Sequence, residues 1–138
     1  MSKTYRVILI DPEARSITER EIDVTVAALH ELIGAETLDN FRLAMFEEDG
    51  HVDMGWVDDG GLSRGLPIHA CLFPTSDPIA GKCVIIGANR MGETADCRIP
   101  IEILRQDVTW LGLILPEVTW DETDIASQAI VTYSRVKM

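Results

Sequence analysis

Basic residues are scarce in this sequence. The 138 residues include 12 Lys and Arg against 23 Asp and Glu, which gives a net charge of −11. Proteins that hold DNA, RNA or anionic lipid without a specific site need a basic face, so this charge argues against all three. Apolar runs are also short, as at Val84–Ile86 and Leu111–Leu115, whereas a membrane-spanning helix needs roughly 20 apolar residues. We therefore expect neither direct nucleic-acid binding nor membrane insertion.

Features of secretion are missing as well. The first residues, MSKTYRVILID, reach an acid after one strand's length and contain no small-residue cleavage site. Only three cysteines occur, Cys71, Cys83 and Cys97, and no two of them form the CxxC pair of zinc ribbons or thioredoxin-like enzymes. An odd number of cysteines without a secretory signal is typical of free, buried thiols in a reducing compartment. The sequence predicts a cytoplasmic protein.

The patterns of catalytic sites are incomplete. Gly61–Gly65 matches GxSxG in letters, but Asp58-Asp59-Gly60 precedes it and Leu66-Pro67 follows, so the strand and helix of a nucleophile elbow are absent. The glycine loop Gly87–Gly92 is followed by Glu93 and Thr94 in place of the Lys and Ser or Thr that hold phosphates. Three separated histidines make no zinc pattern. We predict no catalytic residue, no metal and no cofactor.

Acids are concentrated between Glu47 and Asp59, where six of them surround His51 and no Lys or Arg occurs. The acids lack the alternating order of a calcium-binding loop. We interpret them as solvated hairpin turns, with a divalent cation site as the alternative.

The apolar pattern predicts a single α+β domain, mostly antiparallel sheet with two main helices, over residues 1–138. A first helix begins after Asp23 or Thr25, has its apolar residues on one face and ends at Gly34. A second begins at Pro100, buries Ile101, Leu104, Val108 and Leu111, and ends at Gly112 or Pro116. Strands are expected at 5–10, 16–22, 41–46, 52–57, 68–73, 80–87 and 128–133.

Trp120 stands among acids rather than on an apolar stripe. Its neighbours include Glu117, Asp121, Glu122 and Asp124, and an exposed Trp ringed by acids is a candidate anchor for a partner protein. We predict a non-enzymatic acidic interaction module with these five contact residues, and secondarily with the acidic turns around Asp49 and Asp58. Mimicry of nucleic acid is a variant of this hypothesis, and it requires the acids to share one face.

The alternative function is a small-ligand, nucleotide or phosphate-binding protein or enzyme. It would use Arg64, His69 and Arg90 near the glycine-rich loops, because Arg can form bidentate contacts with phosphate.

Three segments resemble a known family. They are VDDGGL at 57–62, GLPIH at 65–69 and IAGKCVIIG at 79–87. The acid-Gly turn, the GLP step and the I-x-G entry into an apolar strand are similar to the DUF3846 family of small bacteriophage, plasmid and bacterial proteins. His69 replaces the Asn expected after the GLP step. The resemblance implies an accessory protein of mobile elements and supplies no catalytic residue.

The C-terminal segment predicts self-association. Residues 128–134 are β-prone and carry no charge, and an uncharged edge strand is a template for pairing with another chain. If this strand lies at an edge, two copies can pair about a two-fold axis and bury Trp120 or Trp110. The alternative is a central place in the sheet. We predict a homodimer.

Overall fold

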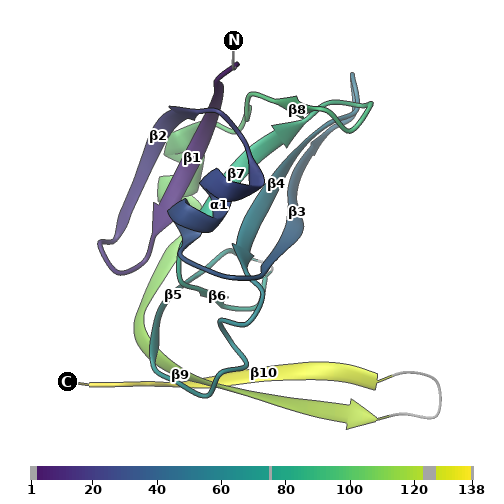
Figure 1. Cartoon of the computed structure of the whole chain (residues 1–138). Coiled ribbons are helices and arrows are strands. Elements are labelled where there is room, and N and C mark those ends of the chain that lie inside the picture. The colour runs from purple at the N-terminus through teal and green to yellow at the C-terminus, as the bar shows by residue number, and fades with distance from the viewer. Residues whose placement is uncertain (1–2, 75, 123–126, 138) are drawn as a thin grey trace.

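The computed structural model describes residues 3–74, 76–122 and 127–137 and has an α+β fold, as the sequence predicts (Figure 1). Two antiparallel sheets and two helices make up the described part of the chain. The elements, in chain order, are β1 (Tyr5–Asp11), β2 (Ser16–Ile22), α1 (Val26–Ile33), β3 (Leu38–Phe46), β4 (His51–Asp58), β5 (Ile68–Leu72), β6 (Ile79–Ala80), β7 (Cys83–Ala88), β8 (Thr94–Ala95), α2 (Ile101–Asp107), β9 (Thr109–Glu122) and β10 (Ser127–Arg135).

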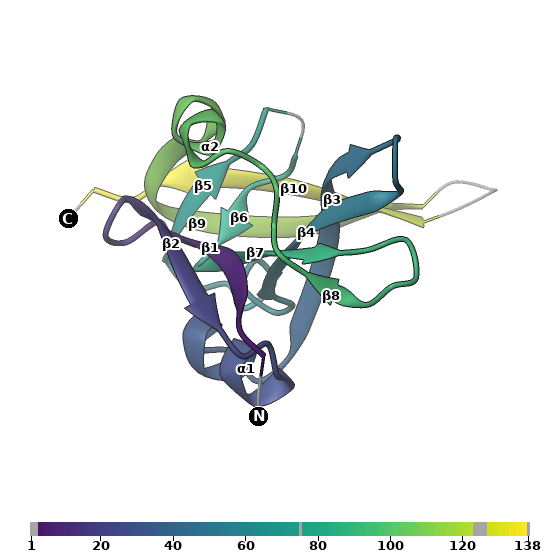
Figure 2. The same cartoon turned by 90° about the horizontal axis from the view of Figure 1, so that it is seen from above.

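The first sheet has the strand order β2-β1-β7-β4-β3, and the short β8 pairs with β7. Its central strands are buried on both faces because α1 covers one face and the second sheet with α2 covers the other (Figure 2). Alternate side chains of β1 and β7 therefore enter different cores. Val7 and Val84 pack toward α1, while Ile8 and Ile85 pack into the core between the two sheets.

Helix α1 has the ends that its sequence predicts. The Thr25 side chain accepts a hydrogen bond from the Ala28 N–H, which caps the helix N-terminus. Gly34 ends the helix with φ of +74°, a left-handed conformation in which glycine carries no steric penalty. Leu29 and Ile33 are the buried residues of the helix.

The second sheet has the order β10-β9-β5-β6. The core between the sheets takes residues from both of them and from α2, including Ile85 of the first sheet, Cys71 of the second and Leu104 of the helix. This shared core fixes β5, and through β5 it fixes the start of β9.

The second helix is shorter than the sequence predicts. It ends at Asp107, and the Val108 N–H bonds to the Leu104 carbonyl as the backbone turns extended. The segment predicted as its second half is the first part of β9. Strand pairing with β5 and β10 overrides the helical spacing of the apolar residues there. The predicted strand 80–87 is likewise divided, because Gly81 turns the chain with φ of +78° between β6 and β7.

Strand β9 bends where it leaves the body. Gly112 has φ of +74°, and the register with β5 shifts between Ala70 and Cys71, which is a β-bulge. Beyond the bulge, β9 and β10 form a long hairpin that stands away from the rest of the molecule (Figure 1). In the described part of the chain, neither helix has the length and apolarity to cross a membrane.

Candidate functional site

The β9–β10 hairpin has two chemically different faces. Cross-strand pairs Val118↔Val131, Trp120↔Ala129 and Pro116↔Tyr133 place their side chains on one face, and this face is apolar. The alternate pairs, Glu117↔Thr132 and Thr119↔Ile130, form the other, more polar face. Apart from the buried Pro116, we call the residues of the first set the hairpin face: Val118, Trp120, Ala129, Val131 and Tyr133.

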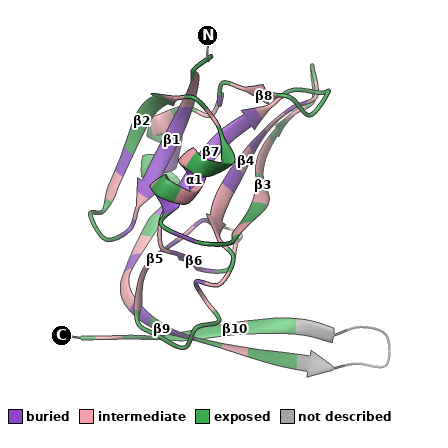
Figure 3. Cartoon of the chain, viewed as in Figure 1, coloured by how far each residue is buried: buried purple, intermediate pink, exposed green. Residues whose placement is uncertain are grey.

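The hairpin face is covered at its base and open further out. At the base, Ile114 and Pro116 lie on the same side of β9 and are buried, Ile114 in a small cluster with Ala70 and Leu111. Farther along, Trp120 is 66% exposed, and Tyr133, which lies across from Pro116 on β10, is 38% exposed. The described residues of β10 are exposed or half-buried over their length (Figure 3). Large exposed apolar groups gathered on one strand pair are typical of an interaction site.

The predicted acidic neighbours of Trp120 belong to the same hairpin. Glu117 lies on β9 and is exposed, and Asp121 and Glu122 end that strand. Asp124 is outside the described residues. The structure therefore confirms that Trp120 is an exposed Trp, and it places Glu117 on the polar face, behind the hairpin face rather than beside it.

The remaining acids do not gather on one face. The turn acids Asp49 and Asp58 lie at opposite ends of β4, and Glu19 and Glu21 lie on β2, at the other edge of the first sheet. Nucleic-acid mimicry requires carboxylates along a single face, so this distribution argues against it.

The structure does not bring Arg64, His69 and Arg90 together. Arg64 is paired with Asp58 after the end of β4, whereas Arg90 lies against Gly50 before its beginning. An eight-residue strand separates these ends by about 25 Å. His69 is on β5 in the second sheet, opposite Leu113. No single phosphate group can contact all three side chains.

Arg64 forms an ion pair with Asp58. Its two terminal nitrogens donate to the Asp58 carboxylate at 2.5 and 2.9 Å. Desolvation acts to raise the pKa of Asp58, but the Arg64 guanidinium and the Gly60 N–H outweigh it and hold this pKa below its ordinary value. The same pairing raises the pKa of Arg64. An anion would have to displace Asp58 to reach this guanidinium.

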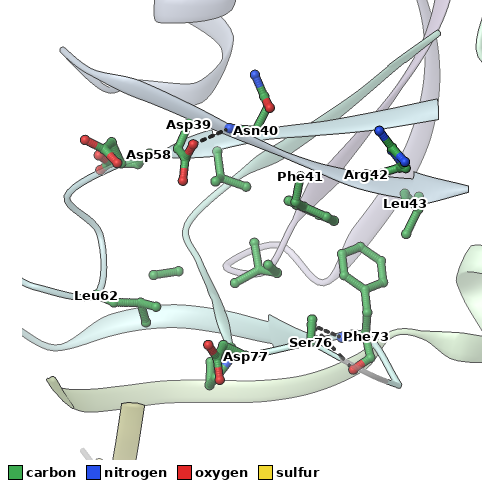
Figure 4. A pocket seen from close by; sticks show the side chains of 15 residues that line it. Asp39, Asn40, Phe41, Arg42, Leu43, Asp58, Leu62, Phe73, Ser76 and Asp77 are labelled. Atoms are coloured by element: carbon green, nitrogen blue, oxygen red, sulfur yellow. Dashed lines mark hydrogen bonds between the residues drawn. The ribbon is translucent and has the colours of Figure 1, made fainter. Parts of the chain in front are cut away.

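A cleft of about 450 Å³ opens between β3, the end of β4 and the segment 73–80 (Figure 4). Phe41 and Phe73 form its apolar wall, with ring centroids 5.7 Å apart. Asp39 and Asp77 stand at its exposed rim, and Asp58 borders it with its carboxylate already paired to Arg64. The side chain of Arg42 points away from the cleft, as alternation along β3 requires. The rim is therefore acidic.

The buried pair His51 and Asp53 is the polar feature that the sequence reading missed. Both residues were interpreted as part of a solvated turn, but Asp53 is fully buried and His51 is 1% exposed. The Asp53 carboxylate accepts hydrogen bonds from His51 Nε2 at 2.6 Å and from the backbone N–H of Ile99 at 2.7 Å and of Arg98 at 3.0 Å. It thus holds the segment before α2 against β4. The one available signal was the His-x-Asp alternation within a strand.

The buried thiols have little chemistry available to them. Burial raises the pKa of Cys71 to about 12 and that of Cys97 to about 12, and it raises the pKa of Cys83 well above its ordinary value. A thiol is nucleophilic as the thiolate, so these three are poor nucleophiles at neutral pH. Among the residues that the structure describes, no group of three His, Cys, Asp or Glu side chains is placed to hold a metal ion.

One protein-family model matches most of the chain. The family model described as "Domain of unknown function (DUF3846)" matches residues 5–104. The chain belongs to the DUF3846 family. This confirms the resemblance noted in the sequence. No curated protein matches the chain, and no solved structure matches it.

The DUF3846 match covers the first sheet, α1, β5, β6 and the first residues of α2. It therefore includes the cleft and the hydrogen bonds by which Asp53 holds Arg98 and Ile99, which we call the Asp53 clamp. The β9–β10 hairpin lies beyond the matched residues, although β9 pairs with β5 inside them.

Proposed function

We propose that this protein is a non-enzymatic interaction module that binds a partner protein through the hairpin face. The observation that carries the proposal is the exposed Trp120 on an apolar strand pair that stands clear of the body. Aromatic residues on open apolar surfaces are frequent anchors of protein interfaces, since they bury a large area and lose little side-chain entropy.

The chemistry of the surroundings indicates the kind of partner. The hairpin face belongs to a chain of net charge −11, and Glu117 lies on the opposite face of the same strand pair, so a matching partner presents an apolar patch on a surface of net positive charge. Net negative charge speeds the encounter with such a partner and disfavours acidic ones. The proposed compartment is the cytoplasm, on the ground that all three cysteines are free and buried. We propose that this chain is an accessory protein of a phage or plasmid and that its partner is a protein of the host cell.

Capture from a lysate of the native host cells tests this proposal. The wild-type chain and Trp120→Ala serve as baits, and Leu66→Ala is the matched control because Leu66 is 61% exposed on the β4–β5 connection. Proteins held by the wild type and by Leu66→Ala are lost with Trp120→Ala, as quantified by mass spectrometry. Identical captures with all three baits would reject the hairpin face as the binding surface.

The cleft favours a second candidate function, binding of a small organic cation with an apolar body. The Phe41 and Phe73 rings supply apolar and π surface, and Asp39 and Asp77 supply negative charge at the rim. This candidate replaces phosphate as the ligand of the alternative hypothesis, since an anion would meet carboxylates there.

A thermal-shift panel of polyamines, aromatic amines, nucleotides and divalent ions tests the cleft. A ligand at 100 times its dissociation constant stabilises the folded state by roughly 2.7 kcal/mol, which such an assay resolves. Amines raise the melting temperature of the wild type and leave Asp39→Asn/Asp77→Asn unmoved. A response confined to nucleotides would contradict the cation assignment.

A further inference from the structure

The last strand of the second sheet has a free backbone edge. Strand β10 pairs with β9 alone and ends the sheet order β10-β9-β5-β6. The Val136 N–H donates to the Leu113 carbonyl directly across the ladder at 2.8 Å, so Leu113↔Val136 is a hydrogen-bonded pair. Alternation then turns the backbone N–H and C=O groups of Ala129, Val131 and Tyr133 outward, away from β9.

The other sheet edges in the described part of the chain carry features that block pairing, and β10 does not. Beyond Ile114 the free edge of β9 contains Pro116 and ends in Asp121 and Glu122, and β8 is only two residues long. Strand β2 carries Glu19, Arg20 and Glu21. Strand β3 has a bulge between Arg42 and Ala44, and β6 is two residues long. Charge, bulges and shortness are the ways in which proteins block edge pairing. By contrast, β10 is nine residues long, regular against β9 and uncharged from 128 to 134.

We infer that a second copy of this chain pairs with the β10 edge, antiparallel and about a two-fold axis at Val131. In this register Val131 faces Val131 of the second copy, and Ala129 faces its Tyr133. The outward backbone groups of both strands are then satisfied, because in an antiparallel pair the residues that exchange hydrogen bonds lie directly opposite. The same-patch contact closes as a dimer, since an isologous interface uses the edge of each copy once.

Charge along the hairpin fits this arrangement although the chain as a whole is acidic. The cations Arg135 and Lys137 lie at the hairpin base, and Asp121 and Glu122 lie at its far end. The two-fold places Arg135 opposite Ser127 of the second copy, which in its own hairpin is opposite Glu122. The basic residues at the base of each hairpin therefore lie beside the acidic far end of the other copy's hairpin. This placement favours the antiparallel arrangement.

The second copy also completes the hairpin face. The outward residues of β10 have their side chains on the same side as Trp120, so pairing joins the two hairpin faces into one four-stranded apolar surface. Trp120 is on β9 and is not on the new seam, which leaves both Trp120 rings at the flanks of the joined surface. The inference rests on the proposed function for the use of this surface, but the seam itself does not depend on Trp120.

Mass in solution tests the inference on the whole chain. At micromolar concentration the wild type has a mass near twice 15.3 kDa by sedimentation or light scattering. Val131→Lys places two ammonium groups opposite each other on the axis and weakens the dimer at least about tenfold. Thr132→Lys is the matched control, because its charge lies on the opposite face and across from Glu117 of its own hairpin. Thr132→Lys and Trp120→Ala both remain dimeric.

Three results of the mass measurements would overturn the inference: a wild-type monomer, a dimer indifferent to Val131→Lys, or equal dissociation by both lysine variants. Hydrogen exchange of backbone amides in the wild type is a second test. It needs no variant, so a variant that fails to fold cannot affect its result. The outward N–H of Val131 is protected in the dimer, and free exchange of this amide in a dimeric sample would overturn the assignment. A monomer that still captures partners through Trp120 would reject the second copy and leave the proposed function standing. A dimer without Trp120-dependent capture would do the reverse.

Discussion

Asp53 shows how a single buried carboxylate can organise a segment that has no regular structure. Residues 96–100 form no helix or long strand, so their backbone donors need partners elsewhere. Asp53 provides them for Arg98 and Ile99 across 45 and 46 positions of sequence. Gly87 is part of the same arrangement, since a Cβ there would lie 2.4 Å from the Asp96 carbonyl oxygen. A side chain at that position would force the segment away from its clamp.

Replacing Asp53 by alanine is expected to destabilise the fold by about 3 to 5 kcal/mol, the usual cost of removing one member of a buried charged network. The substitution leaves the N–H groups of Arg98 and Ile99 and the His51 imidazole without their acceptor. Asp59→Ala, an exposed carboxylate at the end of the same strand, changes the free energy of unfolding by about 0.5 kcal/mol or less. Urea denaturation measures both, and equal effects would contradict the clamp.

At the scale of elements, local signals predicted most of the fold and failed where pairing is non-local. The α1 caps, the first hairpin and the buried strand from Cys83 could be predicted, because turn residues and alternation act within a few positions. The segment after Asp107 could not. Its apolar residues satisfy helical spacing, yet Val108, Thr109 and Trp110 are β-favouring, and only the distant β5 and β10 decide the outcome.

The candidate functional residues, like the fold, could be predicted from the sequence only where the signal is local. Trp120 was found because exposure of a Trp among acids is a local pattern. The cleft was not, because Phe41 and Phe73 are brought together from β3 and the segment after β5. The sequence analysis names Asp58, which borders the cleft, and Arg64, whose guanidinium is paired with the Asp58 carboxylate, but it does not place either residue at a cleft.

The loop that follows β4 is expected to lose its ion pair on acidification. The folded pKa of Asp58 lies below its unfolded value, so the contribution of the pair is fully present above the unfolded pKa and is lost as the pH falls through the folded pKa. Arg64→Gln should therefore lower the urea midpoint at about pH 7 and lower it less at about pH 3, because the contribution of the pair declines once the pH is below the unfolded pKa of Asp58.

Arg20→Gln is the control for this comparison, since Arg20 is exposed on β2 and makes no ion pair with any described residue. Its effect on the midpoint should be small at both pH values. An Arg64→Gln effect that persisted unchanged in acid would show that the guanidinium acts by packing on the loop rather than through the Asp58 carboxylate.

At the scale of the whole molecule, one core joins two sheets that have no strand in common. Ile8 and Ile85 enter it from the first sheet, Cys71 and Ile79 from the second, and Leu104 from α2. The outer part of the β9–β10 hairpin lies beyond this core, and α1 packs in a second core on the other face of the first sheet. A shared core predicts that the two sheets unfold together, because neither can open without exposing the apolar surface of the other.

The three cysteines report on this cooperativity from different places. Cys71 is on β5 of the second sheet, Cys83 is on β7 of the first, and Cys97 is in the segment held by Asp53. In the native protein all three resist a thiol reagent at about pH 8, because burial raises the pKa of each thiol well above its ordinary value. Pulsed labelling along a urea series, read site by site by mass spectrometry, should give one common midpoint. Labelling of Cys71 at lower urea than Cys83 would instead mean that the second sheet, with the hairpin it carries, opens as a separate unit.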